Sequence, residues 1–126
     1  MRYMMIVKGT AASEAGVMPT QAQIAEMGAY NETLAKAGVL VDLSGLKPTS
    51  RGAKIRFSGG SRKLIEGPFA SDDIVSGFWI IKVKSHEEAI EWAMKAPNPA
   101  FGGDGEIELR PFYELEDFQP RASGDR

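Results

Sequence analysis

The stretch from residue 75 to residue 83 is apolar on both sides of an extended backbone, and it predicts a strand at the centre of a sheet. Side chains alternate along a strand, so a half-exposed strand would alternate apolar and polar residues. Here both sides are apolar, which is typical of a strand covered on two faces. The two sides carry Phe78 and Ile80 on one and Trp79, Ile81 and Val83 on the other.

Residues 2–8 have the same pattern and predict a second central strand. One side carries Tyr3, Met5 and Val7, and the other carries Met4 and Ile6. Two further strands are predicted at residues 39–43 and 106–115. The last of these contains Pro111, which cannot donate a hydrogen bond to a neighbouring strand, so it is expected at an edge of the sheet.

Two helices are predicted, each behind a Ser or Thr that can cap its first turn. Thr20 with Gln23 opens a helix that should run to about residue 37, where Gly38 ends it. Ser85 with Glu88 opens the second, which Pro97 stops. The expected apolar stripes are Ile24, Met27, Tyr30 and Leu34 in the first helix and Ala89, Ile90, Ala93 and Met94 in the second.

Residues 53–66 predict a hairpin that turns at Gly59-Gly60. A two-residue turn would place Ile55 opposite Leu64 and Phe57 opposite Arg62 on one face. The other face would carry Lys54, Arg56 and Lys63. Residues 9–19 are small and polar and are expected to form a surface loop.

The element order is strand, helix, strand, inserted hairpin, strand, helix, strand. This predicts an α+β fold of the ferredoxin-like β-α-β-β-α-β type with an antiparallel sheet. Right-handed crossovers place both helices on one face, so the other face has several large side chains and no cover. We expect a homodimer that pairs face to face through this surface; the alternative is that the hairpin folds back over it.

The composition fits one domain, predicted at residues 1–115, followed by a polar tail at residues 116–126. There is no cysteine, no apolar run of bilayer length and no signal-peptide pattern at the N-terminus, so we expect a cytoplasmic protein that does not bind membranes. The net charge of -2 gives no general attraction to nucleic acid, and none is expected as a partner.

Six short segments follow one another over nearly the whole chain: MRYMMI at 1–6, AGVLVD at 37–42, EGPFA at 66–70, GFWII at 77–81, EAIEWA at 88–93 and IELRP at 107–111. Together they resemble the YCII-related proteins, and more closely the branch of that family named for an Asp-Gly-Pro-Phe motif. The resemblance implies a ferredoxin-like fold assembled into a dimeric α/β barrel. It implies little about activity, because most members are uncharacterised.

The resemblance also bears on catalysis. More distant members carry a His and an Asp that are proposed to act as an acid–base pair, and these positions fall near Met27 and Ala96 here. Neither residue can transfer a proton, which weakens an enzymatic interpretation built on that pair. Glu66 stands where the motif has Asp, and it is either a pocket residue or part of a turn set by Gly67 and Pro68.

Candidate ligand-binding residues are polar or aromatic side chains that could reach a sheet-lined cavity. Asp42 and Arg110 could together position a small polar ligand. The remaining candidates are Tyr3, Met27, Tyr30, Glu66, Phe69 and Trp79. Tyr3, Met27, Tyr30 and Trp79 could line the same cavity, but a stripe of this kind more often belongs to the core. His86 is the single histidine, and no ligand spacing suggests a metal or a cofactor.

Three functions remain open at this stage. The first is a homodimer that binds a small organic molecule. The second is an isomerase, lyase or dehalogenase acting on a small organic acid through Asp42, Glu66 or Tyr30. The third, which rests on a family association alone, is a regulatory partner of an alternative sigma factor.

Overall fold

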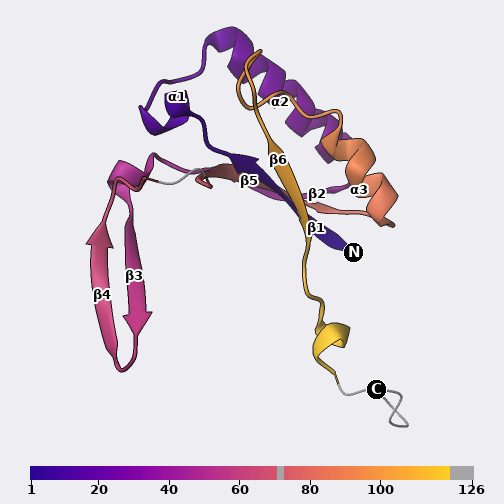
Figure 1. The fold of residues 1–126 in the computed structure, drawn as a ribbon. Helices are drawn as coiled ribbons and strands as arrows, with labels where there is room; N and C mark the ends of the chain where they lie inside the picture. The colour runs from indigo at the N-terminus through magenta and orange to yellow at the C-terminus, as the bar shows by residue number, and fades with distance from the viewer. Residues whose placement is uncertain (71–72, 120–126) are drawn as a thin grey trace.

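A four-stranded antiparallel sheet organises the protein in the computed structural model, which describes residues 1–70 and 73–119 (Figure 1). The strand order is β2-β5-β1-β6, so the two strands that are apolar on both sides lie at the centre, as predicted. The strands are β1 (Arg2–Lys8), β2 (Leu40–Gly45), β5 (Val75–Lys82) and β6 (Ile107–Pro111). The α+β fold of ferredoxin-like order is thereby confirmed.

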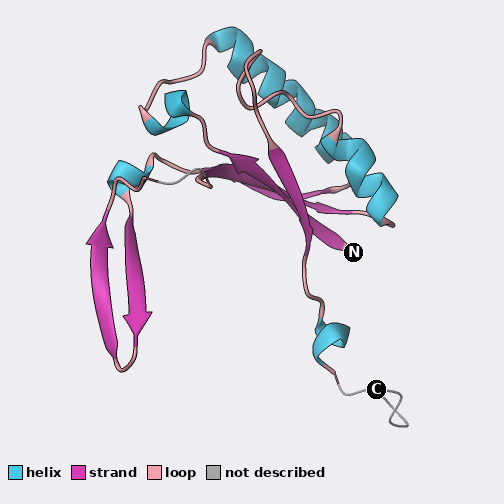
Figure 2. Ribbon diagram, viewed as in Figure 1, coloured by secondary structure: helices cyan, strands magenta, loops and turns pink. Residues whose placement is uncertain are grey.

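Helices α2 (Gln21–Lys36) and α3 (His86–Ala93) both lie on one face of this sheet (Figure 2). Helix α2 begins at the predicted capping box: Thr20 accepts from the Gln23 backbone N–H, and the Gln23 side chain accepts from that of Thr20. Gly38 follows its end at a φ of 75°, where a side chain would be strained.

The cap of α3 differs from the prediction. Ser85 accepts from the Glu88 N–H as expected, but the Glu88 carboxylate accepts from the backbone N–H of Lys84 rather than from that of Ser85. This hydrogen bond is the main reason that the pKa of Glu88 lies below its ordinary value. The carboxylate also accepts from the Trp92 indole at 3.2 Å.

The core lies between the sheet and the two helices. Its buried members come from both central strands, both helices and the residues beside them: Tyr3, Met5, Tyr30, Leu34, Val39, Trp79, Ile81, Val83 and Ala89. The predicted stripes are only partly right, because the start of α2 and the outer side of α3 extend past the sheet. Ile24, Ile90 and Met94 are exposed as a result.

Strands β3 (Ala53–Ser58) and β4 (Ser61–Glu66) form a separate hairpin with the predicted register, Ile55 opposite Leu64 and Phe57 opposite Arg62. The hairpin projects away from the four-stranded sheet instead of folding over it (Figure 1). The hairpin therefore does not cover the face of the sheet opposite the helices.

Three short elements were not predicted. Helix α1 (Ala11–Glu14) interrupts the expected loop at 9–19, and η1 (Thr49–Arg51) and η2 (Leu115–Phe118) are 3-10 turns. Helix α1 forms because Thr10 and Ser13 cap each other reciprocally, with Ser13 taking the place that Glu or Gln usually holds. Strand β6 is shorter than predicted and ends at Pro111. In the described part of the chain, no helix combines the length and apolar composition that a bilayer-spanning helix needs.

Candidate functional site

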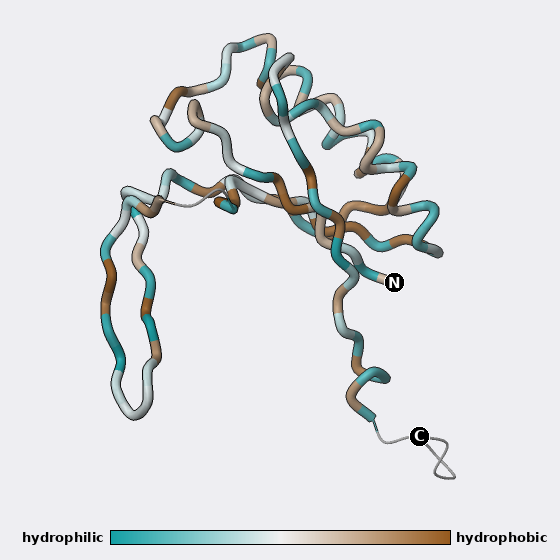
Figure 3. The backbone as a smooth tube through the Cα atoms, in the orientation of Figure 1, coloured by the Kyte–Doolittle hydropathy of each residue, from teal (hydrophilic) through white to brown (hydrophobic). Residues whose placement is uncertain are grey.

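The face of the sheet opposite α2 and α3, called here the open face, is the strongest candidate for a functional surface. Its apolar centre consists of Met4 and Ile6 on β1 and Phe78 and Ile80 on β5, which the strand register places directly opposite one another. All four are half-buried by their neighbours alone. The colouring of Figure 3 shows hydrophobic residues along these central strands. The centre of the open face is thus an apolar strip that no other described element covers.

Charged side chains border one end of this strip. Lys8 contacts the Glu108 carboxylate at 3.1 Å and also pairs with Asp73. Arg110 donates to Glu108 at 3.2 Å. The hydrogen bond from Lys8 is the main cause that lowers the pKa of Glu108, and the hydrogen bond to Asp73 is the main cause that raises the pKa of Lys8. Both shifts favour the charged forms of Lys8 and Glu108 at neutral pH.

The other end of the open face carries Arg2, which binds the segment that follows β6. Its guanidinium donates to Glu114 at 3.1 to 3.3 Å and lies 4.7 Å from the centre of the Phe112 ring. The hydrogen bonds from Arg2 lower the pKa of Glu114. A hollow of about 580 Å³ lies here, lined in part by Arg2, Arg110, Tyr113 and Glu116.

Asp42 and Arg110 lie on the open face, but one chain does not bring them together. Asp42 stands opposite Ile80 on the edge strand β2, and Arg110 stands opposite Met4 on the edge strand β6. Two strands separate them, a distance of about 14 Å at roughly 4.8 Å per strand. A ligand held by both residues of one chain would have to span the width of the sheet.

The aromatic candidates lie on the other side of the sheet, within the core. The rings of Tyr30 and Trp79 meet edge to face at 5.3 Å, and the Tyr30 hydroxyl donates to the Trp92 carbonyl at 2.7 Å. Burial raises the pKa of Tyr30 to about 12. Tyr3 is buried too, with its hydroxyl 3.0 Å from His86 Nδ1. These three side chains are used in packing and do not reach the open face.

Met27 is half-buried on α2, on the helix side of the sheet. The other position matched to the acid–base pair, Ala96, is half-buried beyond the end of α3. Neither side chain carries a titratable group, so the structure adds no proton donor or acceptor at these two positions.

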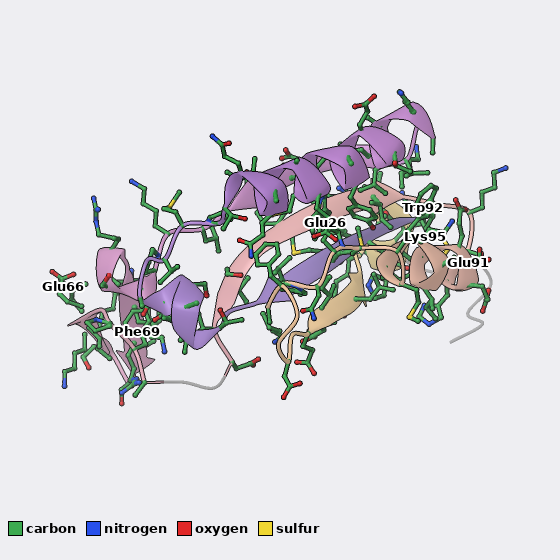
Figure 4. All side chains as sticks on the ribbon, turned by 90° about the horizontal axis from the view of Figure 1, so that it is seen from above. Glu26, Glu66, Phe69, Glu91, Trp92 and Lys95 are labelled. Carbon is green, nitrogen blue, oxygen red and sulfur yellow. The ribbon has the colours of Figure 1, made fainter. Side chains whose placement is uncertain are left out.

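Glu66 and Phe69 lie at the base of the hairpin, at the opposite end of the molecule from Trp92 and Lys95 (Figure 4). A Cβ at Gly67 would stand 1.7 Å from the Thr49 carbonyl oxygen, so this position has room only for glycine. The Phe69 N–H donates to Thr49 Oγ1 at 3.0 Å. These contacts support the interpretation of the motif as a turn that docks on η1.

Two residues that sequence reasoning missed hold this turn in place. The Glu14 carboxylate accepts from the backbone N–H and the hydroxyl of Thr49, at 2.9 and 2.6 Å. The hydrogen bond from the hydroxyl is the main cause that lowers the pKa of Glu14. The two residues are 35 positions apart, one in α1 and one in η1, so no local pattern could have indicated the contact.

Comparison with known proteins identifies a family for this chain. The family model for the YCII-related domain matches residues 1–115. An uncharacterised protein of Rhizobium meliloti (strain 1021) is 32% identical over 87 residues, which cover 68% of this chain and 69% of that protein. Assignment to the Asp-Gly-Pro-Phe branch stays a prediction. Because the family model matches residues 1–115 of the 126, the chain belongs to the YCII-related family.

Proposed function

We propose that the protein is a homodimer that pairs through the open face and binds a small organic acid in the space between the two sheets. The observation that carries the proposal is the apolar centre of the open face, formed by Met4, Ile6, Phe78 and Ile80 without a covering layer among the described elements. Burial of apolar surface is favourable by about 25 cal/mol per Å². A second copy can cover both strips with one interface, and two-fold pairs are the commonest oligomers.

Arg110 is the side chain of the open face that supports an acidic ligand. The strand registers place four basic side chains on this face, from Arg2, Lys8, Lys82 and Arg110, and two acids, Asp42 and Glu108. Two further acids from outside these strands, Glu114 and Asp73, pair with Arg2 and Lys8. Arg110 is paired with Glu108 only through one exposed contact, which is a weak interaction in water. A ligand carboxylate in a partly enclosed space would compete well for its guanidinium, which can bind a carboxylate through two hydrogen bonds.

Binding without catalysis fits the side chains better than the enzymatic alternative. Met27 and Ala96 cannot transfer protons, and the raised pKa of Tyr30 keeps its phenol neutral at physiological pH. Asp42 and Glu66 lie on different parts of the fold, the sheet and the hairpin base. The interpretation as a sigma-factor partner has no specific support among these contacts.

The molar mass in dilute solution tests the dimer, by light scattering after size exclusion. We expect twice the chain mass for the parent protein and a monomer for Phe78→Arg, which places a charge in the centre of the open face. Ile24→Arg is the matched control: it adds the same charge at an exposed apolar position on the helix side. A parent monomer, or a Phe78→Arg dimer, would refute the pairing.

Ligand binding is tested by thermal shift against a panel of small mono- and dicarboxylates and lactones. We expect stabilisation by at least one carboxylate and loss of that shift in Arg110→Ala. The matched control is Arg51→Ala, which removes an exposed arginine at the base of the hairpin. No shift across the panel, or an equal loss in both variants, would refute the carboxylate site.

A further inference from the structure

Two arms extend from the sheet on the side away from the helices (Figure 1). The hairpin arm is residues 53–66, made of β3 and β4. The C-terminal arm is residues 112–118, which follow β6 and include η2. Each carries exposed apolar side chains that a lone chain leaves in water: Ile55 at 52%, Phe57 at 64% and Leu64 at 59% on the hairpin arm, and Tyr113 at 74%, Leu115 at 74% and Phe118 at 71% on the C-terminal arm.

The arms have opposite charges. The hairpin arm has four basic residues, Lys54, Arg56, Arg62 and Lys63, and one acid, Glu66, for a net charge of +3. The C-terminal arm has three acids, Glu114, Glu116 and Asp117, and no base, for a net charge of -3. Lys54, Arg56 and Lys63 lie on the face of the hairpin opposite Ile55, Phe57 and Leu64, whereas Arg62 and Glu66 share the face of these three residues. The opposite net charges therefore attract a hairpin arm to a C-terminal arm at long range, and two copies of the same arm repel. Arg62 is the basic residue on the apolar face itself.

The arms leave the sheet at opposite ends of its strands, so they do not meet within one chain. The hairpin arm lies between the end of β2 and the start of β5, where Gly45 and Gly77 are paired. The C-terminal arm follows Pro111, which pairs with Tyr3 at the other end of β1.

In a dimer that pairs through the open face, the two-fold axis can run across the strands. The hairpin arm of one copy then lies at the same end of the paired sheets as the C-terminal arm of its partner. An axis running along the strands would instead place the two hairpin arms at the same end. The charges favour the first arrangement over the second.

We propose that the hairpin arm of each copy docks, by its face bearing Ile55, Phe57 and Leu64, on the C-terminal arm of a second copy of this chain. The contact occurs twice in a two-fold dimer. It gives the hairpin a packing surface, which a two-stranded ribbon needs because it is only marginally stable by itself in water. The proposal rests on the proposed dimer through the open face and specifies its orientation.

Engineered cysteines test the contact cleanly, because the chain has none of its own. One form carries Phe57→Cys and a tag that increases its mass; the other carries Leu115→Cys. After mixing and mild oxidation, we expect a disulfide-linked species of the summed mass as the main product on a non-reducing gel. The control pairs Phe57→Cys with Met18→Cys, a position that is 79% exposed beside α2 and is expected to yield at least tenfold less product.

The outcomes separate this proposal from the dimer itself. A dimeric mass with no more Phe57–Leu115 product than in the control, or with Phe57–Phe57 links as the main product, would overturn the arm contact and leave the dimer standing. A monomeric mass would overturn both.

As a second measurement, Arg62→Glu should raise the dimer dissociation constant at least threefold, whereas Lys47→Glu, an equal charge change outside the hairpin arm, should change it less than twofold. Equal effects of the two substitutions would count against the contact.

Discussion

Truncating Leu34 to Ala tests where the boundary of the core runs along α2. Leu34 is 0% exposed and belongs to the core cluster that the helix forms with the central strands, whereas Ile24, on the same predicted stripe, is 53% exposed. Removing a fully buried Leu side chain loses its transfer free energy and leaves a cavity, which together cost about 3 to 4 kcal/mol. Ile24→Ala removes a side chain already half in water and gains a few tenths of a kcal/mol in helix propensity, so its effect should stay within about 0.5 kcal/mol.

The assay is equilibrium unfolding in urea at one fixed protein concentration, since subunit association would otherwise change the apparent stability. We expect the two midpoints to separate widely at similar slopes. Comparable losses of unfolding free energy in Leu34→Ala and Ile24→Ala would refute the placement of the core under the C-terminal half of α2. An Ile24→Ala loss above about 2 kcal/mol would mean that another surface covers the start of the helix.

Two further predictions concern the arms. Because Arg2 lowers the pKa of Glu114, the ionised carboxylate stabilises the attachment of the C-terminal arm above its unfolded pKa, and this stabilisation is lost as the pH falls through the lowered folded value. After correction for the intrinsic rate, hydrogen exchange of residues 112–118 in the parent protein should therefore accelerate below about pH 4.5. In Glu114→Gln the exchange should be fast throughout and nearly independent of pH in this range. Identical pH profiles for the two proteins would contradict the role of the Arg2–Glu114 pair. Gly67→Ala should loosen the hairpin base, because the added Cβ would stand 1.7 Å from the Thr49 carbonyl oxygen, while Gly60→Ala meets no atom within 4 Å. Limited proteolysis should cut Gly67→Ala within the hairpin at least tenfold faster than Gly60→Ala, and equal rates would show that the turn tolerates a side chain.

Much of the fold followed from local patterns in the sequence. The two segments that are apolar on both sides identified the centre of the sheet because the period of two is fixed by strand geometry. The Gly-Gly turn set the register of the hairpin because a two-residue connection allows only one alignment. Pro111 marked the edge strand for the equally local reason that it lacks an N–H group.

The errors share a different physical cause: they depend on how far one element extends past another. A hydrophobic stripe predicts which side of a helix faces the core, but not how much of its length the sheet covers. Ile24 and Met94 were therefore expected in the core and are exposed. Helix α1 was missed because its cap uses Ser13, a weaker signal than the usual Glu or Gln.

The sequence singled out Asp42 and Arg110 as polar residues that could share a surface, but it could not give the distance between them. Asp42 lies on the open face because the pairing of β2 with β5 is irregular between Leu40 and Asp42, and the strand order places Asp42 and Arg110 on opposite edges of the sheet. Strand order is a property of the whole chain, and residues 42 and 110 carry no information about it. A ligand that contacts both charges would therefore have to span the width of the sheet.

The same reasoning explains why the functional proposal rests on surfaces and not on a catalytic group. Within the described part of the chain, the aromatic candidates are engaged in the core and the motif residues Glu66 and Phe69 lie at the hairpin base. What the fold leaves in water is an apolar strip and two oppositely charged arms. Large exposed apolar surfaces on a soluble domain mark interaction sites, and two-fold symmetry can cover the strip and both arms at once. The proposed dimer would therefore cover three separate features that a single chain leaves exposed.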